Sequence, residues 1–346
     1  MVVFRKGFTL ALVSLSLLAA TPARAAEKLR IGYLPVTGHA KFFVAKEQGF
    51  FTREGLDVEL VEFVNSADGI NALNAGKIDV GAFGTTAPLV HISKGTDLRV
   101  IGGIMGEDAA LVIAPASASS IKGVADLRGK KVATVRLASG DAVLRGALHD
   151  AGLDWKKDVQ IFELKNPPAV LEAVKSGQVD AGVIWGPHDL RAEDQGLLVV
   201  ARSRTLQPGH PCCRLTVSAS RLPERTTWVH LLRAILLAER YAQEHRPETV
   251  AAIVKYLKLD PKLVERAYYS GYLEQGTDPN LKGIQKFWRI MKESEFIDLS
   301  APGSRDPIEG HVELALYRTA LDGLASENPK DPYWATLQRK FVERNL

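Results

Sequence analysis

The chain contains little sulfur and few aromatic side chains. Its 346 residues include two cysteines, three methionines and 7% aromatic residues. A chain of this length with two cysteines cannot be held by a disulfide framework, so its stability must come from an apolar core. The length predicts about two domains. No cluster of Lys and Arg interleaved with aromatic residues is present, so nucleic acid is not an expected partner.

Long apolar runs are also missing, apart from one near the N-terminus. Residues 7–20 form this run, which follows Arg5 and Lys6 and precedes the A-x-A pattern at 23–25. The run is shorter than the ~20 residues that a membrane-spanning helix needs. Its order of charge, apolar run and small residues is typical of a secretory signal peptide. We therefore expect residues 1–25 to be a signal peptide and the mature protein to be periplasmic. No cysteine lies near the expected cleavage site, so we do not expect the protein to be lipid-anchored.

Neither sign of charge dominates the mature chain. Loss of Arg5, Lys6 and Arg24 with the signal peptide reduces the 44 Lys and Arg to 41, against 40 Asp and Glu. The basic balance of the full sequence therefore gives no reason to expect an acidic partner.

The sequence repeats itself. Residues 57–83 align without a gap on residues 158–184, at an offset of 101. The identical positions in the first copy are Asp57, Val58, Glu62, Asn65, Ala72, Gly76, Asp79 and Gly81. Apolar strand patterns alternate with helical spacing in each copy, which is typical of parallel sheets with crossover helices. Short α/β units share general features, but a gapless register across loops favours two similar lobes.

We therefore predict an α/β fold with two lobes, each a mostly parallel sheet flanked by helices, and two hinge crossings. The first lobe is expected to comprise residues 26–114 and 213–346, and the second residues 115–212. The hinge is placed near Val112 and Leu215, on strands 108–115 and 213–219. Helical segments at 226–245, 248–257, 261–273 and 284–294 should cover the first lobe.

Polar loops follow the predicted strands. Ligands of open α/β sheets bind beyond the carboxyl ends of the strands, and helix N-termini there offer N–H groups to anionic or polar ligands. The candidate contacts are Thr37, Gly38, His39, Asn65, Ser66, Gly84, Thr85, Thr86, Ser139, Gly140, Asn166, Trp185 and His188. Each Ser, Thr or Asn could equally be a helix cap without a ligand. Arg136 and Arg214, expected near the cleft, favour an anionic solute.

The two cysteines are adjacent, within QPGHPCCRLTV at 207–217. Neighbouring Cα atoms are about 3.8 Å apart, whereas disulfides span about 4.4–6.8 Å, so a bond between them would be strained. Neighbours in a regular strand point to opposite faces, although Pro211 could free Cys212 from the strand.

Three interpretations of Cys212 and Cys213 remain open: buried packing, thiol or redox chemistry, and a soft-metal or organometal site. The metal ligands would be His210, Cys212 and Cys213, with His39 and His188 as further candidates. At least one cysteine is expected to face the ligand. No other cofactor is predicted.

Several motifs in a fixed order carry a family resemblance. They are LRIGYLP, AKEQGFFTREGLDVEL, ALNAGKIDVGAFGT, DLRGKKVAT and AVKSGQVDAGVIWGP. With them the chain resembles the nitrate/sulfonate/taurine-type (NitT/TauT) periplasmic substrate-binding proteins of ABC importers. The resemblance implies a type II periplasmic-binding-protein fold and a non-catalytic, monomeric receptor. Such a receptor captures a small solute, for example a sulfonate, by hinge bending and delivers it to a membrane permease.

The resemblance also implies where the ligand binds. The contacts would come from the loops after Leu34, Phe63 and Phe83 and from those around Ser139, Asn166 and Trp185. Members often carry an acidic residue after the tryptophan, where this chain has Gly-Pro-His at 186–188. This departure leaves the ligand class open.

An enzyme on the same fold is the alternative. Pyrimidine-precursor synthases carry a histidine followed by a cysteine-rich run, and aryl-sulfinate desulfinases depend on one cysteine; His210, Cys212 and Cys213 resemble these features in part. A secretory signal favours a transport receptor over a cofactor-synthesising enzyme. The sequence has no Gly-rich phosphate loop and no HExxH helix.

Overall fold

The computed structural model describes residue 2, residues 26–300 and residues 308–346. The predicted signal peptide, residues 1–25, lies outside these ranges except for residue 2. Within them no helix is both long enough and apolar enough to cross a membrane.

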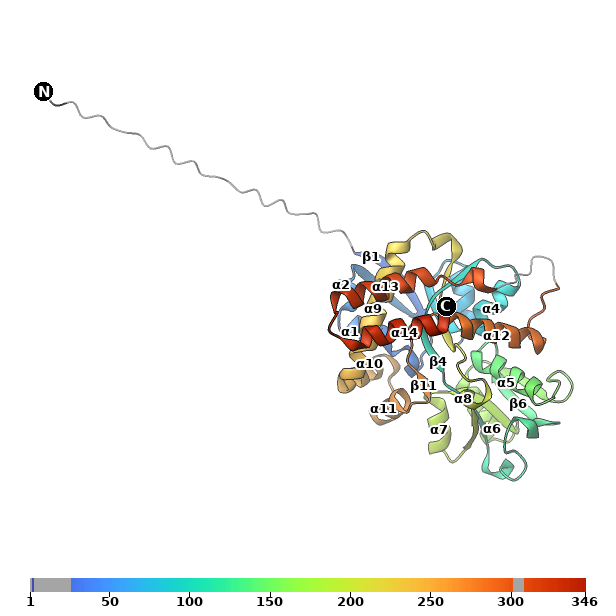
Figure 1. The fold of residues 1–346 in the computed structure, drawn as a ribbon. Coiled ribbons are helices and arrows are strands. Elements are labelled where there is room, and N and C mark those ends of the chain that lie inside the picture. The colour runs from blue at the N-terminus through green and yellow to red at the C-terminus, as the bar shows by residue number, and fades with distance from the viewer. Residues whose placement is uncertain (1, 3–25, 301–307) are drawn as a thin grey trace.

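Two separate sheets organise the described part of the chain (Figure 1). The first has the strand order β11-β4-β10-β3-β1-β2, and these strands span Leu273–Glu274, Leu98–Glu107, Cys213–Ser218, Val80–Gly84, Glu27–Tyr33 and Leu56–Glu62. The second has the order β7-β6-β8-β5-β9, spanning Gln160–Leu164, Lys131–Val135, Ala181–Trp185, Ala109–Ile113 and Leu198–Arg202. The predicted two-lobed α/β fold is confirmed.

Helices connect and cover the strands. In the first lobe they are α1 (Ala40–Glu47), α2 (Phe50–Arg53), α3 (Ser66–Asn74) and α4 (Thr86–Ser93). In the second they are α5 (Ser139–Asp150), α6 (Pro167–Lys175), α7 (His188–Asp194) and α8 (Ser203–Leu206). The C-terminal helices are α9 (Arg225–Glu244), α10 (Arg246–Leu257), α11 (Pro261–Tyr269), α12 (Leu281–Glu293), α13 (Leu314–Glu327) and α14 (Pro332–Asn345).

The C-terminal helices pack mainly on the first lobe, as the sequence predicted. Helix α9 contacts α1 and α2, and α13 contacts β4 (Figure 1). Helix α12 also contacts α5 of the second lobe. This helix therefore adds to the contact between the two lobes.

The sequence repeat is also a repeat in the structure. Strand β1 pairs in parallel with β2 and β3, and β6 pairs in parallel with β7 and β8. Ile31 lies opposite Val80 in the first sheet, and Val132 lies opposite Ala181 in the second. Both residues of the second pair are 101 positions after those of the first. The two lobes therefore share not only their elements but also their strand register.

Both faces of the second sheet are buried. Leu111 and Val132 belong to one apolar cluster, whereas the next residues along each strand, Val112 and Ala133, belong to another. Because successive strand side chains point to opposite faces, these clusters lie on the two sides of the sheet. Burial on both faces is the usual state of parallel strands flanked by helices.

The chain passes between the sheets twice. The first crossing is at Asp108, between β4 and β5, and Glu107 and Asp108 both have a positive φ, 61° and 78°. The second crossing runs from the end of β9 through α8 to Cys213, where β10 begins. These two segments link the lobes, and a hinge would be formed by them.

The predicted boundary at residue 114 is therefore wrong. It assigned strand 108–115 to the first lobe, but Val112 pairs with Gly182 and Val199 in the second sheet. Leu215, the other predicted hinge residue, pairs with Ala82 within the first sheet. The error arises because the apolar stretch 98–114 contains two strands. Only Asp108 separates these two strands.

Candidate functional site

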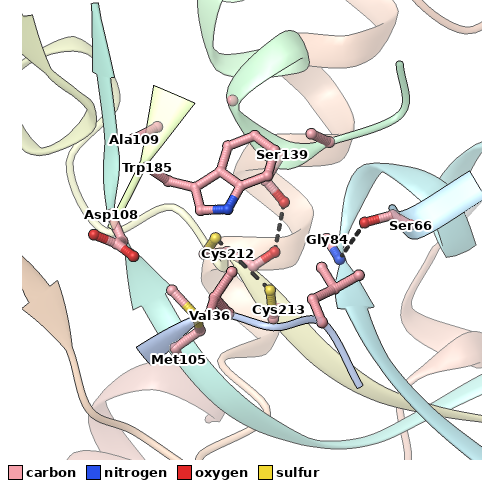
Figure 2. A pocket seen from close by; sticks show the side chains of 13 residues that line it. Val36, Ser66, Gly84, Met105, Asp108, Ala109, Ser139, Trp185, Cys212 and Cys213 are labelled. Atoms are coloured by element: carbon pink, nitrogen blue, oxygen red, sulfur yellow. Dashed lines mark hydrogen bonds between the residues drawn. The ribbon is translucent and has the colours of Figure 1, made fainter. Parts of the chain in front are cut away.

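A pocket lies where the two lobes meet (Figure 2). Its empty space is about 350 Å³, including the part open to solvent. Its lining residues are Leu34, Val36, Ser66, Gly84, Met105, Asp108, Ala109, Ala138, Ser139, Gly140, Trp185, Cys212 and Cys213. Most of these side chains are apolar. The polar groups are two serine hydroxyls, one carboxyl, two thiols and the indole N–H of Trp185.

The pocket is placed by the carboxyl ends of the parallel strands. Leu34 follows β1, Gly84 ends β3, and Trp185 ends β8, while Ser66 and Ser139 begin α3 and α5. Ligand sites of open α/β sheets lie at this edge. The two similar lobes present these edges to one another, so the pocket has a wall from each.

The lobes touch through the hydroxyl of Ser139. Its Oγ accepts a hydrogen bond from Thr85 N (2.9 Å) and donates one to the Cys212 carbonyl (2.5 Å). Thr85 N also donates to the Cys212 carbonyl at 2.8 Å. Ser139 belongs to the second lobe and Thr85 to the first. These bonds can form only when the lobes are close, so the structure represents a closed arrangement.

Both cysteines contribute to the pocket (Figure 2). Cys212 precedes β10 and Cys213 is its first residue, so strand alternation does not force the two side chains apart. Both are free thiols, and their Sγ atoms are 3.8 Å apart. The hydrogen bond to Cys213 and burial raise the pKa of the Cys212 thiol well above its usual value. Cys212 is therefore protonated at neutral pH.

His210 does not join the cysteines in a metal site. Its Nδ1 lies 3.2 Å from Glu107 Oε2, and Glu107 also accepts hydrogen bonds from Ser203 Oγ (2.8 Å) and Gly209 N (2.6 Å). Burial opposes protonation of His210, but hydrogen bonds to Cys212 and Glu107 raise its pKa to about 9. An imidazolium has no lone pair to offer a metal.

The predicted metal site at His210, Cys212 and Cys213 is thus wrong. Among the residues that the structure describes, no three His, Cys, Asp or Glu side chains gather in a way that could hold a metal ion. His210 instead lies at the crossing between the lobes, where it pairs with the carboxylate of Glu107.

Asp108 is the only carboxyl among the residues that line the pocket. Its Oδ1 accepts a weak hydrogen bond from Gly186 N at 3.3 Å, and its Oδ2 is buried without a partner in the described structure. Burial and the nearby charge of Asp189 raise the pKa of Asp108 well above its usual range. Asp189 itself is paired with Arg202, at 2.5 Å. Burial therefore favours the protonated, neutral form of Asp108.

About half of the predicted contact residues line the pocket. Those that do are Ser66, Gly84, Ser139, Gly140, Trp185, Cys212 and Cys213. Those outside its lining are Thr37, Gly38, His39, Asn65, Thr85, Thr86, Arg136, Asn166 and His188.

Local structure explains several of the residues outside the lining. Asn65 and Asn166 cap α3 and α6, accepting from the backbone N–H groups three residues on. His39 Nδ1 accepts from Leu34 N at 3.1 Å inside the first lobe. Burial lowers the pKa of His39 to about 3 and that of His188 to about 4. Both histidines are therefore neutral.

Neither predicted arginine lines the pocket. The side chain of Arg136 is 72% exposed and lies 3.9 Å from Glu163. Arg214 is buried, and its guanidinium donates to the carbonyls of Met105 and Cys213. The positive charge that would attract an anionic solute is thus absent from the lining described here.

Sequence reasoning missed the lining residues Leu34, Val36, Met105, Asp108, Ala109 and Ala138. One signal was present. The acidic pair at 107–108 interrupts an otherwise apolar stretch from 100 to 114. Two adjacent acids in such a stretch indicate that the chain leaves one buried strand and enters another. The apolar lining residues gave no comparable signal, because their sequence pattern is the same as that of residues in the apolar core.

Two lobes, two crossings and one pocket between facing strand ends define the class of two-lobed solute-binding proteins. The chain belongs to the NMT1-like family, whose sequence model matches residues 23–258. The predicted resemblance to nitrate- and sulfonate-type periplasmic binding proteins is confirmed.

Individual relatives agree with this assignment. An Escherichia coli (strain K12) protein named as an aliphatic sulfonates-binding protein is 35% identical over 196 residues, which cover 56% of this chain and 60% of the relative. The crystal structure of the periplasmic nitrate-binding protein NrtA from Synechocystis PCC 6803 shares the fold. It matches with a TM-score of 0.76 and 17% identity, covering 89% of this chain and 92% of NrtA.

One relative bears a different name. A Haemophilus influenzae protein named as a thiamine biosynthesis protein is 26% identical over 248 residues, which cover 70% of this chain and 77% of the relative. The family name alone therefore does not define the ligand of this chain.

Proposed function

We propose that this protein is a periplasmic receptor that captures a small solute between its lobes and delivers it to an ABC-type membrane permease. It acts as a monomer and catalyses no reaction. The observation that carries the proposal is the pocket at the facing strand ends. Its walls come from both lobes, and Ser139 of one lobe is hydrogen-bonded to Thr85 and Cys212. A solute held there contacts both lobes at once and so favours the closed state over the open one.

The solute class follows from the pocket lining. The relatives named for sulfonate and nitrate binding supply the hypothesis of an anionic ligand. The lining of this chain argues for a neutral one, because none of the described lining residues is Lys or Arg and burial favours the neutral form of its one carboxyl. Burying an unpaired charge in such surroundings is costly. We therefore place neutral solutes ahead of sulfonates.

A receptor role also fits the state of the cysteines. The nucleophile in cysteine catalysis is the thiolate, and the raised pKa of Cys212 keeps that thiol protonated. The neighbouring His210 cannot accept its proton, because His210 is itself protonated beside Glu107. The enzyme alternative would need one of these groups to be deprotonated at neutral pH.

The proposal is tested by a thermal-shift screen of the mature protein, followed by small-angle X-ray scattering. The screen should include ethanesulfonate, nitrate and small neutral amides and alcohols, with and without reductant. A solute at 100 times its Kd stabilises the folded state by about 2.7 kcal/mol. The bound solute should also reduce the radius of gyration and should be recovered chemically unchanged.

Trp185→Ala should abolish the response, because this side chain lines the pocket. Phe162→Ala is the matched control: it removes an aromatic ring from the surface of the same lobe, where Phe162 is 42% exposed. A tightly bound solute that leaves the scattering unchanged would contradict closure. Conversion of the solute to a product would contradict the receptor role.

A further inference from the structure

One wall of the pocket is rich in sulfur (Figure 2). Cys212, Cys213 and Met105 all line it, and Cys213 pairs with Met105 across the β10 and β4 strands. The sequence contains only two cysteines, and both are here. Their Sγ atoms are 3.8 Å apart, so one small molecule can reach both. Thiol and thioether sulfur favour soft, polarisable ligands.

The rest of the lining is mostly apolar, and its polar side chains are those of Ser66, Ser139, Asp108 and the indole N–H of Trp185. Val36 and Trp185 face the sulfur atoms, and Ala109 and Ala138 add small apolar surfaces (Figure 2). Such a pocket suits a ligand that enters neutral and remains neutral after it binds. A metal cation does not meet this condition well, because thiols must release protons to bind it.

We propose that the pocket takes a trivalent organoarsenic dihydroxide, R–As(OH)₂, with a small R group, by bonding arsenic to Cys212 and Cys213. The assignment rests on the proposed function, since it places this ligand in the pocket between the lobes. The R group lies against the apolar wall formed by Val36 and Trp185.

The bonding step is a balanced exchange. Each thiol forms one S–As bond and displaces one hydroxyl group, whose As–O bond breaks, and the thiol proton leaves with that hydroxyl as water. Two exchanges yield R–As(S-Cys)₂ and two water molecules. Arsenic remains trivalent, so no oxidant or reductant is consumed. The product has no net charge, as the pocket requires, and the exchange is reversible, as a receptor requires.

The number and spacing of the thiols select this ligand among thiophilic species. Trivalent arsenic is pyramidal and holds its substituents on one side, so two close sulfur atoms can share it. A two-coordinate metal ion such as Hg²⁺ places its ligands on opposite sides, which adjacent cysteines at 3.8 Å do not allow. Arsenite has three hydroxyl groups to exchange, and the chain offers only two thiols. The R group takes the place of the third bond.

The test uses methylarsenous acid, CH₃As(OH)₂, with the reduced mature protein. Native mass spectrometry should show one CH₃As unit per chain, with the loss of two hydrogen atoms. Both cysteines should then resist alkylation by iodoacetamide. Cys212→Ser and Cys213→Ser should each weaken binding by about 100-fold or more, because the second bond forms intramolecularly. Met291→Leu is the matched control, since it replaces a buried thioether outside the pocket lining and keeps both thiols.

The controls separate the possible outcomes. Circular dichroism and the melting temperature establish that each serine variant is folded. Equal affinity of the wild type and either serine variant, or alkylation of both cysteines at an unchanged rate, overturns the assignment. If methylarsenous acid fails to bind while another solute compacts the protein in scattering, the receptor function stands and this ligand is wrong. If methylarsenous acid binds without compaction, the ligand is supported and hinge closure is wrong.

Discussion

A single residue, Asp108, combines three unusual properties. It lies at the crossing between the lobes, it has a φ of 78°, and it is a buried carboxyl of raised pKa. Left-handed backbone is uncommon for residues other than glycine and costs energy unless the surroundings enforce it. Asp and Asn tolerate this conformation better than most residues. The protein therefore holds a buried acid at the pocket on a backbone conformation that few side chains would accept.

We expect Asp108→Asn to stabilise the protein at neutral pH. The native state keeps the Asp108 proton to a higher pH than the unfolded state does, so this group reduces stability as pH rises above the unfolded pKa of about 3.9. Asn mimics the protonated acid, keeps the acceptor for Gly186 N and has no such cost. The gain should therefore be larger at pH 8 than at pH 4.

Chemical denaturation of wild type and variant at pH 4 and pH 8 checks this prediction. The gain should shrink at pH 4. Asp189→Asn is the control, because it breaks the pair with Arg202 and should destabilise the protein instead. A gain of the same size at both pH values would show that Asp108 is not protonated in the native state.

At the scale of elements, the second crossing is tied to the first by Glu107. This residue ends β4 and accepts hydrogen bonds from Ser203, at the start of α8, and from Gly209 and His210 beyond it. Burial opposes its ionisation, yet the bonds from His210 and its neighbours lower the pKa of Glu107 overall. One carboxylate thus fixes the segment that leads to both cysteines.

Glu107→Gln should destabilise the protein by about 2 kcal/mol near pH 6, the range for a hydrogen bond to a charged group. The His210 contribution is fully present below its unfolded pKa of about 6.5 and is lost as pH rises through about 9. The Glu107 contribution is present above about pH 4.3 and is lost as pH falls. The loss of stability should therefore be smaller at pH 10 than at pH 6.

Denaturation curves across this pH range provide the measurement. Ser203→Ala removes one hydrogen bond to the same carboxylate without changing its charge, so its cost of about 1 kcal/mol should vary little with pH. If the two variants have the same pH dependence, the Glu107 and His210 charges do not stabilise the hinge.

Much of the fold could be predicted from the sequence, because the gapless repeat preserves the same strand register in both lobes. Asp79 and its repeat partner Asp180 accept from the backbone N–H of Arg30 and Lys131, one residue before the paired β1 and β6 positions. The same spacing in both copies was visible in the sequence. The pocket was harder to predict, because polarity at a strand end does not distinguish a cap from a contact. Asn65 is a cap, whereas the apolar Met105 lines the pocket.

For the whole molecule, the lobes also meet away from the pocket. Trp155 Nε1 of the second lobe donates to the Ser294 carbonyl at 2.6 Å, next to α12. On another side Arg266 of α11 pairs with Asp194 of α7 at 2.9 Å. In the proposed receptor these contacts would stabilise the closed state without touching a solute. They should then adjust affinity by setting the fraction of closed molecules.

Trp155→Phe should weaken solute affinity up to about fivefold, the equivalent of one hydrogen bond of about 1 kcal/mol. The phenyl ring keeps the stacking surface for Arg145, whose guanidinium lies 4.0 Å from the Trp155 ring. Titration calorimetry with the solute identified by the screen measures the change. Trp334→Phe is the matched control, because Trp334 is buried in the first lobe and its Nε1 has no partner within the described structure. Equal affinities of the two variants would mean that the Trp155 contact does not govern closure.

The position of β10 has a consequence for how the chain folds. This strand lies between β3 and β4, yet it follows the whole second sheet in the sequence. As the chain emerges from N- to C-terminus, the facing edges of β3 and β4 stay unpaired until residues 213–218 are available. The second sheet can form earlier, because all of its strands precede residue 203. Contacts between such distant segments are slow to form, and open strand edges invite association with other chains. We therefore expect the late insertion of one central strand, the strand that begins with Cys213, to limit the folding of the first lobe.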